Sequence, residues 1–376
     1  MYSLGWEGNR ILNVIWFKRD LRLEDNIILS KAFHEKNVLL LYIFEPEMWK
    51  QDDLSYRHFM FLKEAVFDFK KNLSNFNNNL CIKVGNVLDV FNKIHRKYKI
   101  KKIISHQETW NAWSYERDIK VNKWADKNSI QRIEFPQNGV VRALKNRDGW
   151  SGNWKNFMLQ PLSKFPHGLK TITLDSDLDR INSIEKKFNK ILPVPLKGNR
   201  RIAMKLLNNF LYLNGQNYQK GMSSPLSAEN CCSKLSAYIS FGLISLREIF
   251  QNAEKRKKEL KFENDKVWTS SVNSFLKRLR WHCHFIQKLE DEPRIQFECF
   301  HPAYNNLRIN EFNRNYFEAW KNGMTGFPMI DASMRFLINN GWINFRMRAM
   351  LVSFASYHLW LDWRKTGIFL ANLFTD

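Results

Sequence analysis

The sequence lacks the features that would place it in several classes of protein. Its 376 residues include only 15 glycines and 10 prolines, too few for a disordered or low-complexity chain. No apolar run approaches the roughly 18–20 residues that a helix needs to span a bilayer. The start of the chain shows no basic stretch followed by an apolar one, so nothing in it indicates export. We therefore expect a soluble, intracellular protein of the cytoplasm.

Cysteine is also scarce, and its spacing does not suit a metal site. The five cysteines are odd in number and contain no Cys-x-x-Cys pair, which argues against a disulfide framework and against structural zinc. His282, Cys283 and His284 are adjacent, but residues one and two positions apart on a helix do not share a face. We expect no metal.

Acidic residues are few relative to basic ones. Lys and Arg number 59 against 37 Asp and Glu, which gives a formal net charge of +22. Such a charge attracts polyanions, with nucleic acid first and an acidic membrane surface second. The chain also holds 14 tryptophans, and cations interleaved with aromatic rings are what stacking on unpaired bases requires. A biased genomic composition explains lysine-rich surfaces equally well, so charge alone does not choose between these explanations.

The first half of the chain alternates apolar runs with amphipathic stretches. Strands are predicted at 11–18, 38–44, 80–85, 101–107 and 131–136, with helices between them. This order predicts an α/β domain with a parallel sheet covered by helices on both faces, Rossmann-like in type. No Gly-x-Gly-x-x-Gly follows the first strand, so the dinucleotide-binding fingerprint is absent.

The periodicity changes twice after this domain. We assign residues 1–136 to the α/β domain and 201–376 to an all-helical domain. Between them, residues 137–200 contain four prolines and little periodicity, which is typical of an interdomain connector.

Two stretches of the helical half carry candidate binding residues. Ser233 and Ser236 precede an apolar helical run, where hydroxyls and free N–H groups either bind a phosphate or simply cap the helix. In 274–292, Arg278, Trp281 and Phe285 share one helical face. This pattern suits base stacking, and equally a core tryptophan with arginines extending to the surface.

Several separated motifs, in the same order along nearly the whole chain, resemble the photolyase/cryptochrome flavoproteins. They include VIWFKRDLRLEDN, SKLSAYISFGLIS, RLRWHCHFIQ, GMTGFPMIDASMRFLINNGWINFRMR and LWLDWR. The resemblance implies an α/β antenna domain and a helical domain that binds FAD. It further implies a basic face for damaged DNA, a monomeric chain without a membrane partner, and a second antenna chromophore of unknown identity.

The resemblance also implies roles for individual residues. The cofactor-binding set is Tyr218, Cys232, Ser233, Lys234, Leu235, Ser236, Phe275, Arg348 and Asp376. Within it, Arg348 and Asp376 form the ion pair beside the flavin ring. Trp363 is the middle tryptophan of the chain that photoreduces the flavin, and Trp281 stacks on a flipped-out dimer. The DNA-binding set is Arg278, Trp281, Phe345 and Arg346, and the catalytic set is Trp281, Arg348 and Trp363.

The sequence departs from the family pattern at lesion contacts. Arg278 stands where the family usually has Glu, Phe345 where repair enzymes commonly have Asn, and Met222 where the family has Arg. No tryptophan lies near Asn310 at the outer end of the tryptophan chain, where Trp320 or Tyr304 is the substitute. The family continues beyond the position of Asp376, so we expect an FAD-binding domain that is incomplete at its C-terminus.

Three functions follow. A deoxyribodipyrimidine photo-lyase, a carbon–carbon lyase that repairs pyrimidine dimers under light, uses both Trp281 and the positive charge. A cryptochrome-type blue-light receptor without repair activity is favoured by the changed contact residues. A flavin-free protein that binds nucleic acid by charge alone predicts a steep dependence on salt and no preference for lesions.

Overall fold

The computed structural model describes residues 11–189 and 191–376, and it divides into two compact units. The α/β unit comprises the chain up to Met48, with Phe69–Gln137 and Leu162–Lys186. The helical unit comprises Trp49–Asp68, Asn138–Pro161 and Lys187–Asp376. The first ten residues, which bear on the expected lack of an export sequence, lie outside the described residues. No helix in the described part of the chain is both long and apolar enough to span a membrane.

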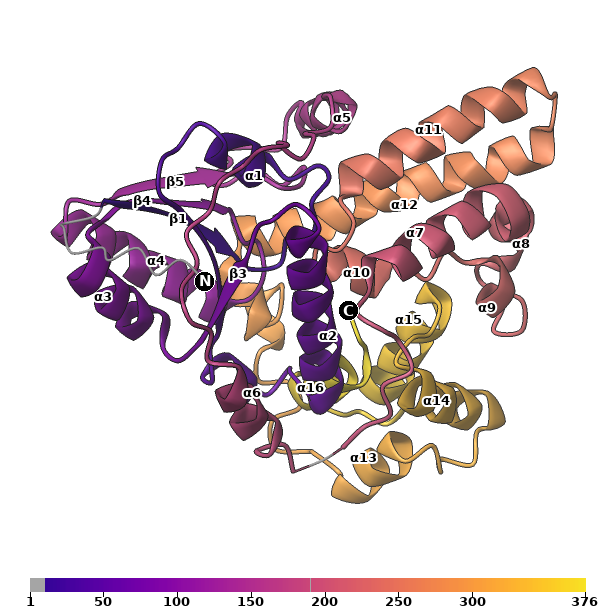
Figure 1. Cartoon of the computed structure of the whole chain (residues 1–376). Coiled ribbons are helices and arrows are strands. Elements are labelled where there is room, and N and C mark those ends of the chain that lie inside the picture. The colour runs from indigo at the N-terminus through magenta and orange to yellow at the C-terminus, as the bar shows by residue number, and fades with distance from the viewer. Residues whose placement is uncertain (1–10, 190) are drawn as a thin grey trace. The chain divides into compact units, whose positions relative to one another are not determined.

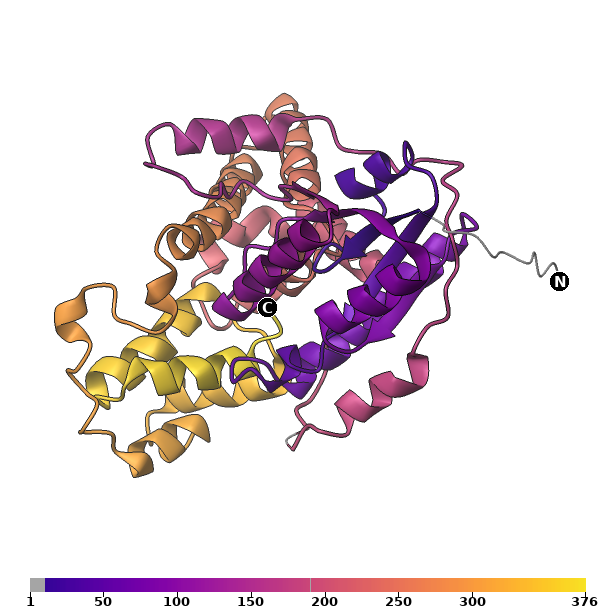
Figure 2. The ribbon, with the colours of Figure 1, turned by 90° about the vertical axis from the view of Figure 1, so that its left-hand side faces the viewer.

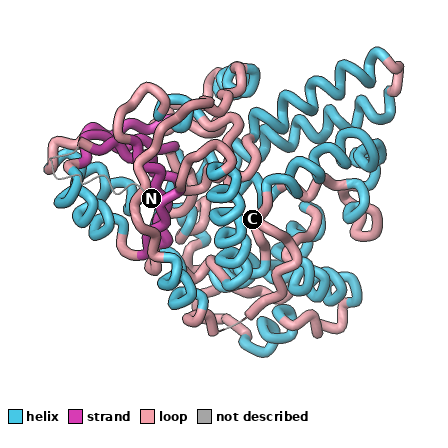
Figure 3. Tube along the Cα trace, in the orientation of Figure 1, coloured by secondary structure: helices cyan, strands magenta, loops and turns pink. Residues whose placement is uncertain are grey.

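A five-stranded, wholly parallel sheet forms the centre of the α/β unit, as predicted. Its strand order is β3-β2-β1-β4-β5, and Figure 3 shows the strands grouped together in one part of the trace. The strands are β1 (Leu12–Phe17), β2 (Val38–Phe44), β3 (Leu80–Val84), β4 (Ile100–His106) and β5 (Gln131–Phe135). The helices wholly within this unit are α1 (Ile27–Ala32), α3 (Val87–Tyr98), α4 (Ala112–Lys127) and α6 (Leu178–Glu185).

Both faces of the sheet are covered at its centre, where every residue of β1 and β2 is buried. On one face Trp16 of β1 meets Phe91 of α3 with ring centroids 5.4 Å apart, and Phe91 stacks on Trp124 of α4. On the other face Phe17, the next residue of β1, meets Phe69 at 4.9 Å. Figure 2 shows helices on both sides of the strands.

Paired charges fill the carboxyl edge of this sheet. Arg117 donates hydrogen bonds to Glu45 at 3.0 Å, to Asp118 at 2.9 Å and to Glu108, while Lys18 pairs with Asp118 at 2.8 Å. Burial alone would raise the pKa of Asp118, but Lys18 and Arg117 outweigh it and lower that pKa. The strand order reverses between β1 and β4, which is where open α/β sheets bind ligands. Here the chain's own ion pairs occupy that edge.

The helical unit contains the second half of the chain and two segments that precede it. One long helix, α2 (Tyr56–Ser74), contributes its first 13 residues to this unit and its last turns to the α/β unit. Wholly within the helical unit lie α5 (Trp150–Leu159), α7 (Arg200–Asn209), α8 (Tyr218–Gly221), α9 (Ala228–Cys231), α10 (Ser236–Ser240), α11 (Leu246–Phe262), α12 (Lys266–Asp291), α13 (Arg314–Lys321), α14 (Pro328–Asn340), α15 (Phe345–Ser353) and α16 (Trp363–Leu373). The longest two, α11 and α12, lie side by side in Figure 1.

The domain boundaries predicted from sequence differ from these units. The segment Trp49–Asp68 precedes residue 136 yet packs with the helical unit, where Phe61 contacts Tyr238 at 5.3 Å and Phe241 at the same distance. The predicted connector 137–200 contains α5 and α6 and is divided between the two units. The predicted fold class itself, a parallel α/β sheet with a helical second half, is confirmed.

Local sequence explains how α14 begins and ends. Pro328 occupies the first turn, where its missing N–H costs nothing. Gly341 ends the helix in the left-handed region, with φ at +64°. A Cβ at this glycine would lie 2.5 Å from Thr375 Oγ1 and 2.9 Å from Arg57 Cδ, so a side chain there meets both strain and a steric clash.

The Arg57 side chain joins three segments of the helical unit. Its guanidinium is completely buried and donates to the carbonyl of Pro193 at 2.7 Å, to that of Ile338 at 2.5 Å and to that of Leu373. Burial lowers the pKa of Arg57 to about 10, so the group stays charged at neutral pH. The three carbonyls come from the loop before α7, from α14 and from the end of α16.

Replacing Arg57 with Ala should lower the free energy of unfolding by about 3–5 kcal/mol, because three buried carbonyls lose a charged donor. Arg57→Lys should lose less, since an ammonium group can serve some of these acceptors. Urea denaturation followed by circular dichroism measures both changes. Lys258→Ala, an exposed charge removal on α11, is the control. Equal stabilities of Arg57→Ala and Lys258→Ala would contradict this assignment.

A neighbouring histidine should make stability depend on pH. Burial lowers the pKa of His58 to about 4, and its Nδ1 accepts a hydrogen bond from the Ser55 N–H at 3.1 Å. The unfolded chain therefore binds a proton near pH 6.5 that the folded chain excludes, and stability falls as the pH drops from about 6.5 to about 4, by about 3 kcal/mol. His58→Asn keeps an acceptor near the Nδ1 position and should flatten this part of the urea-denaturation profile. Parallel profiles of the two proteins would refute the assignment.

Candidate functional site

Six residues predicted to bind cofactor or DNA line one pocket of the helical unit. This cavity of about 490 Å³, here called the Arg278 pocket, lies between α8, α12 and the start of α15. Its predicted lining residues are Tyr218, Cys232, Arg278, Trp281, Phe345 and Arg346. Met222, the residue at one of the family departures, lines it as well. The volume falls within the range of small-molecule sites.

The side chain of Arg278 contacts two aromatic rings of this pocket. Its guanidinium lies 4.1 Å from the ring centroid of Trp281 and 5.4 Å from that of Phe345. One of its nitrogens, Nη1, is buried and has no hydrogen-bond partner among the described residues. A buried cationic N–H without an acceptor costs free energy, so the pocket is suited to a ligand that brings an acceptor, such as a phosphate or a carbonyl oxygen.

The predicted phosphate loop forms a tight turn beside this pocket. Lys234 has a left-handed backbone with φ at +54°, and its ammonium lies 5.2 Å from the Trp342 ring centroid. Ser236 begins α10, which has only five residues and therefore a weak helix dipole. A phosphate here would be bound mainly by hydroxyl and ammonium groups. Leu235 is buried in the core, so its side chain is not available to a ligand.

Phe275, predicted to lie against the cofactor, is a packing residue. Its ring contacts Phe210 at 4.5 Å and Tyr218 at 6.1 Å, and only 4% of its surface is exposed. Its influence on the Arg278 pocket therefore passes through Tyr218, whose hydroxyl pKa is raised chiefly by burial. The role of Phe275 against the cofactor, which the resemblance implies, stays a prediction.

Arg348 and Asp376 form a two-pronged ion pair. Nη1 and Nη2 of Arg348 lie 2.9 and 2.8 Å from the two carboxylate oxygens of Asp376. Arg348 Nε also donates to the Ile343 carbonyl, and the guanidinium lies 4.0 Å from the Phe374 ring centroid. Burial alone would raise the pKa of Asp376, but Arg348 outweighs it and lowers that pKa. The carboxylate therefore stays ionised and fixed in place.

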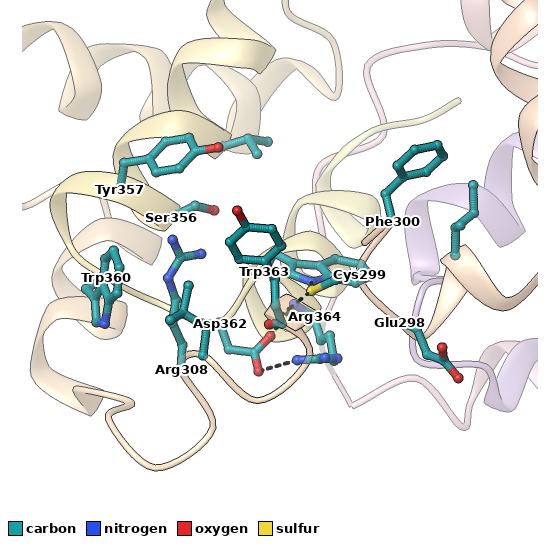
Figure 4. Close-up of a pocket in the computed structure, with 14 residues that line it drawn as sticks. Glu298, Cys299, Phe300, Arg308, Ser356, Tyr357, Trp360, Asp362, Trp363 and Arg364 are labelled. Atoms are coloured by element: carbon teal, nitrogen blue, oxygen red, sulfur yellow. Dashed lines mark hydrogen bonds and ion pairs between the residues drawn. The ribbon is translucent and has the colours of Figure 1, made fainter. Parts of the chain in front are cut away.

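Trp363 lines a different and larger cavity, the Trp363 pocket, of about 790 Å³ (Figure 4). Its indole N–H donates to Cys299 Sγ at 3.3 Å, and Tyr304 lines the same pocket. Trp320, the other predicted substitute in the tryptophan chain, is fully buried in the core. Of the two predicted substitutes, Tyr304 is therefore the one that shares a cavity with Trp363.

A third cavity was not predicted from the sequence. The Trp150 pocket, about 540 Å³, is lined by Trp150, Ser151, Arg280, Trp281, His284 and Phe285. It shares Trp281 and Phe285 with the Arg278 pocket. The helical face of Arg278, Trp281 and Phe285 was visible in the sequence, but the contribution of α5 was not, because α5 lies more than a hundred residues earlier in a segment predicted as a connector.

No group of three or more potential metal ligands occurs within residues 11–189 and 191–376. His282, Cys283 and His284 illustrate the reason. Cys283 is buried in the core, while His284 lines the Trp150 pocket and lies 3.1 Å from Arg147.

Comparisons with known proteins match both units. Residues 13–161 match a family model described as DNA photolyase, and residues 275–376 match one described as the FAD binding domain of DNA photolyase. These matches confirm the resemblance stated from the motifs and the class of cofactor domain.

Relatives of both functional kinds are similar to the chain. Cryptochrome-2 of Arabidopsis thaliana is 26% identical over 93% of this chain and 60% of its own length. A deoxyribodipyrimidine photo-lyase of Buchnera aphidicola is 26% identical over 94% of this chain and 76% of its own. The chain thus spans less than two thirds of the plant relative.

Solved structures share the fold. An archaeal photolyase from Sulfolobus tokodaii, described with two FAD molecules, has a TM-score of 0.80 at 23% identity and covers 97% of this chain and 79% of its own. A Synechocystis cryptochrome has a TM-score of 0.83 at 19% identity, covering 99% and 80%. At these identities the likeness concerns the fold.

The Arg348–Asp376 pair should contribute to stability only where Asp376 is ionised. Arg348→Met should cost about 1–3 kcal/mol at pH 7, because a largely buried carboxylate loses its partner. The difference from the unsubstituted protein should shrink as the pH falls below about 3.9, where the unfolded chain takes up the proton. Urea denaturation at pH 7 and pH 3 measures this. A difference that is the same at both pH values would mean that packing alone carries the effect.

Proposed function

Because the chain belongs to the photolyase/cryptochrome family, we propose that it binds FAD in its helical unit and acts under blue light on pyrimidine dimers in DNA. The reaction is that of a deoxyribodipyrimidine photo-lyase, which breaks carbon–carbon bonds of the dimer. The observation that carries the proposal is the Arg278 pocket, where an exposed tryptophan and two arginines converge in the unit that matches an FAD-binding domain.

The residues present fit the flavin cofactor. FAD carries two phosphates and a ring with polar edges. The site offers Nη1 of Arg278, which has no hydrogen-bond partner in the described part of the chain, the ammonium of Lys234, which also pairs with Glu229 at 3.4 Å, and the hydroxyls of Ser233 and Ser236. The pair of Arg348 with Asp376 provides one fixed charge of each sign. Tyr218 and Cys232 complete the side of the pocket next to the phosphate loop.

The light-driven chemistry would be supplied by the cofactor. FAD, when bound and reduced, supplies the light absorption and the electron that opens a dimer. The protein's own residues bind and orient the substrate. The Arg348–Asp376 pair holds charge at a fixed position, where it would favour one protonation state of a flavin ring bound beside it.

DNA would be held by aromatic rings and unpaired cations. Trp281 is 42% exposed, Phe345 and Arg346 are also exposed, and no Asp or Glu is among the described residues that line the Arg278 pocket. Extruding a damaged base pair costs a few kcal/mol, less than for an intact pair, and stacking on an aromatic ring offsets that cost. The net charge of +22 adds attraction for the phosphate backbone.

A photoreceptor without repair activity is the second candidate, and one observation favours it. Arg278 already covers one face of Trp281, at 4.1 Å from the ring centroid. A flipped base must displace this guanidinium or use another part of the ring. The cryptochromes among the relatives are consistent with this alternative.

The proposal also covers electron transfer to the flavin and a second chromophore. We place Trp363 and Tyr304 on the route by which electrons reach the flavin, because they share the Trp363 pocket. A second chromophore stays a prediction. The archaeal photolyase described with two FAD molecules is an example of a relative with a second chromophore. In this chain, ion pairs occupy the carboxyl edge of the sheet.

An absorption spectrum of the protein purified in the dark, followed by illumination with an oligonucleotide that contains a thymine dimer, tests the proposal. We expect a bound-flavin spectrum and light-dependent loss of the dimer. Trp281→Ala should weaken dimer binding about 5- to 150-fold, the loss of about 1–3 kcal/mol of stacking. Trp360→Ala, at a tryptophan of similar exposure (40%) in the Trp363 pocket, should bind the dimer normally.

The outcomes separate the candidates. Bound flavin without repair would support the photoreceptor. A folded, colourless protein would exclude both light-driven functions for this chain and leave binding by charge.

A further inference from the structure

Two aromatic side chains of α12 line two of the pockets at once. Trp281 and Phe285 lie one helical turn apart, with ring centroids 6.4 Å apart and ring planes nearly perpendicular. Both are exposed, Phe285 to 52%, and both line the Arg278 pocket and the Trp150 pocket. We call these two side chains the aromatic ridge.

The two sides of the ridge differ in what they present. Arg278 covers one face of Trp281 and lines only the Arg278 pocket. Trp281 lines the Trp150 pocket as well, where Arg278 is absent from the lining. A base that stacks on the indole from that pocket would not meet the guanidinium there.

The Trp150 pocket has the chemistry of a nucleotide site. Arg280 is exposed and donates to Ser151 Oγ at 2.9 Å, which holds its guanidinium at the pocket wall. His284 adds a second aromatic ring, and the cations of Arg147, Lys288 and Arg280 contribute, after burial, to lowering its pKa. No carboxylate is among the described residues that line either pocket. An aromatic base with a phosphate matches this combination of stacking surface and positive charge.

We propose that the aromatic ridge stands between two successive bases of a single strand, with one nucleotide in each pocket. Arg280 holds the phosphate of the nucleotide in the Trp150 pocket, and the ridge keeps the two bases unstacked. This inference rests on the proposed function in assuming that the Arg278 pocket faces DNA. It adds a second nucleotide site and a substrate class, unpaired strands.

The preference for single strands follows from the cost of separating bases. Wedging an aromatic side chain between stacked bases costs a few kcal/mol per step in a duplex. An unpaired strand has less stacking to lose and exposes both base faces. A lesion in a single strand or a distorted duplex should therefore be the preferred substrate.

Binding of labelled oligothymidylates without damage tests the inference. Affinity should rise steeply from one nucleotide to two, because the second nucleotide fills the second pocket, and a three-nucleotide strand should bind more tightly than a hairpin duplex at the same salt concentration. Arg280→Ala and Phe285→Ala should each weaken binding of the three-nucleotide strand about 5- to 150-fold. Both substitutions are at exposed positions, and circular dichroism checks their fold.

Matched controls separate this site from general attraction by charge. Lys258→Ala removes an exposed cation from α11, and Phe262→Ala removes an aromatic ring that is 91% exposed. Neither should alter the dependence on strand length. If Arg280→Ala weakens single-strand and duplex binding equally, and by no more than Lys258→Ala does, charge alone acts and the inference is wrong.

The proposed function and this inference can fail separately. If Trp281→Ala impairs dimer binding while Arg280→Ala leaves single-strand binding unchanged, the Trp150 pocket holds no nucleotide and the proposed function stands. If Arg280→Ala and Phe285→Ala abolish the gain with strand length in a protein without flavin or repair, the nucleotide site stands and the light-driven function fails.

Discussion

The arrangement of the helical unit depends on a single buried guanidinium. Arg57 comes from early in the sequence, yet it binds carbonyls of the loop before α7, of α14 and of the end of α16. Fixing the end of α16 fixes Asp376, which in turn orients Arg348 of α15. The start of α15 carries Phe345 and Arg346 into the Arg278 pocket. The geometry of the candidate site thus follows from hydrogen bonds made far from it in sequence.

Two arginines illustrate two ways of accommodating a charge. In the α/β unit, Arg117 is satisfied by carboxylates at the strand ends, and Lys18 pairs with one of them, so the chain itself occupies the usual ligand position of such a sheet. In the helical unit, Arg278 stacks on aromatic rings and keeps a buried N–H without an acceptor among the described residues. This donor belongs to a pocket-lining residue, so a ligand that brings an acceptor is favourable there.

Sequence reasoning predicted the elements well because each is determined by local periodicity. The strands at 12–17 and 38–44 are apolar apart from Asn13 because both sheet faces are covered there, and Pro328 and Gly341 bound α14 as their backbone preferences require. Motif order predicted which residues gather around the Arg278 pocket. Periodicity could not assign the first turns of α2 to the helical unit. Nor could it reveal that Trp150 and Arg280 line the same pocket, because these residues lie in distant segments of the chain. Nor could it show Arg278 lying on Trp281, which depends on side-chain direction.

Gly341 restricts which sequences can keep this arrangement. Its left-handed φ already disfavours other residues, and the space beyond its Cα is taken by Arg57 and Thr375. A substitution there is disfavoured by backbone energy and by volume, and a smaller residue at 57 would relieve only part of the second effect, because Thr375 stays in place. Among related chains, glycine here should therefore persist even where the anchoring arginine has been replaced, whereas the reverse combination, arginine without glycine, should be rare.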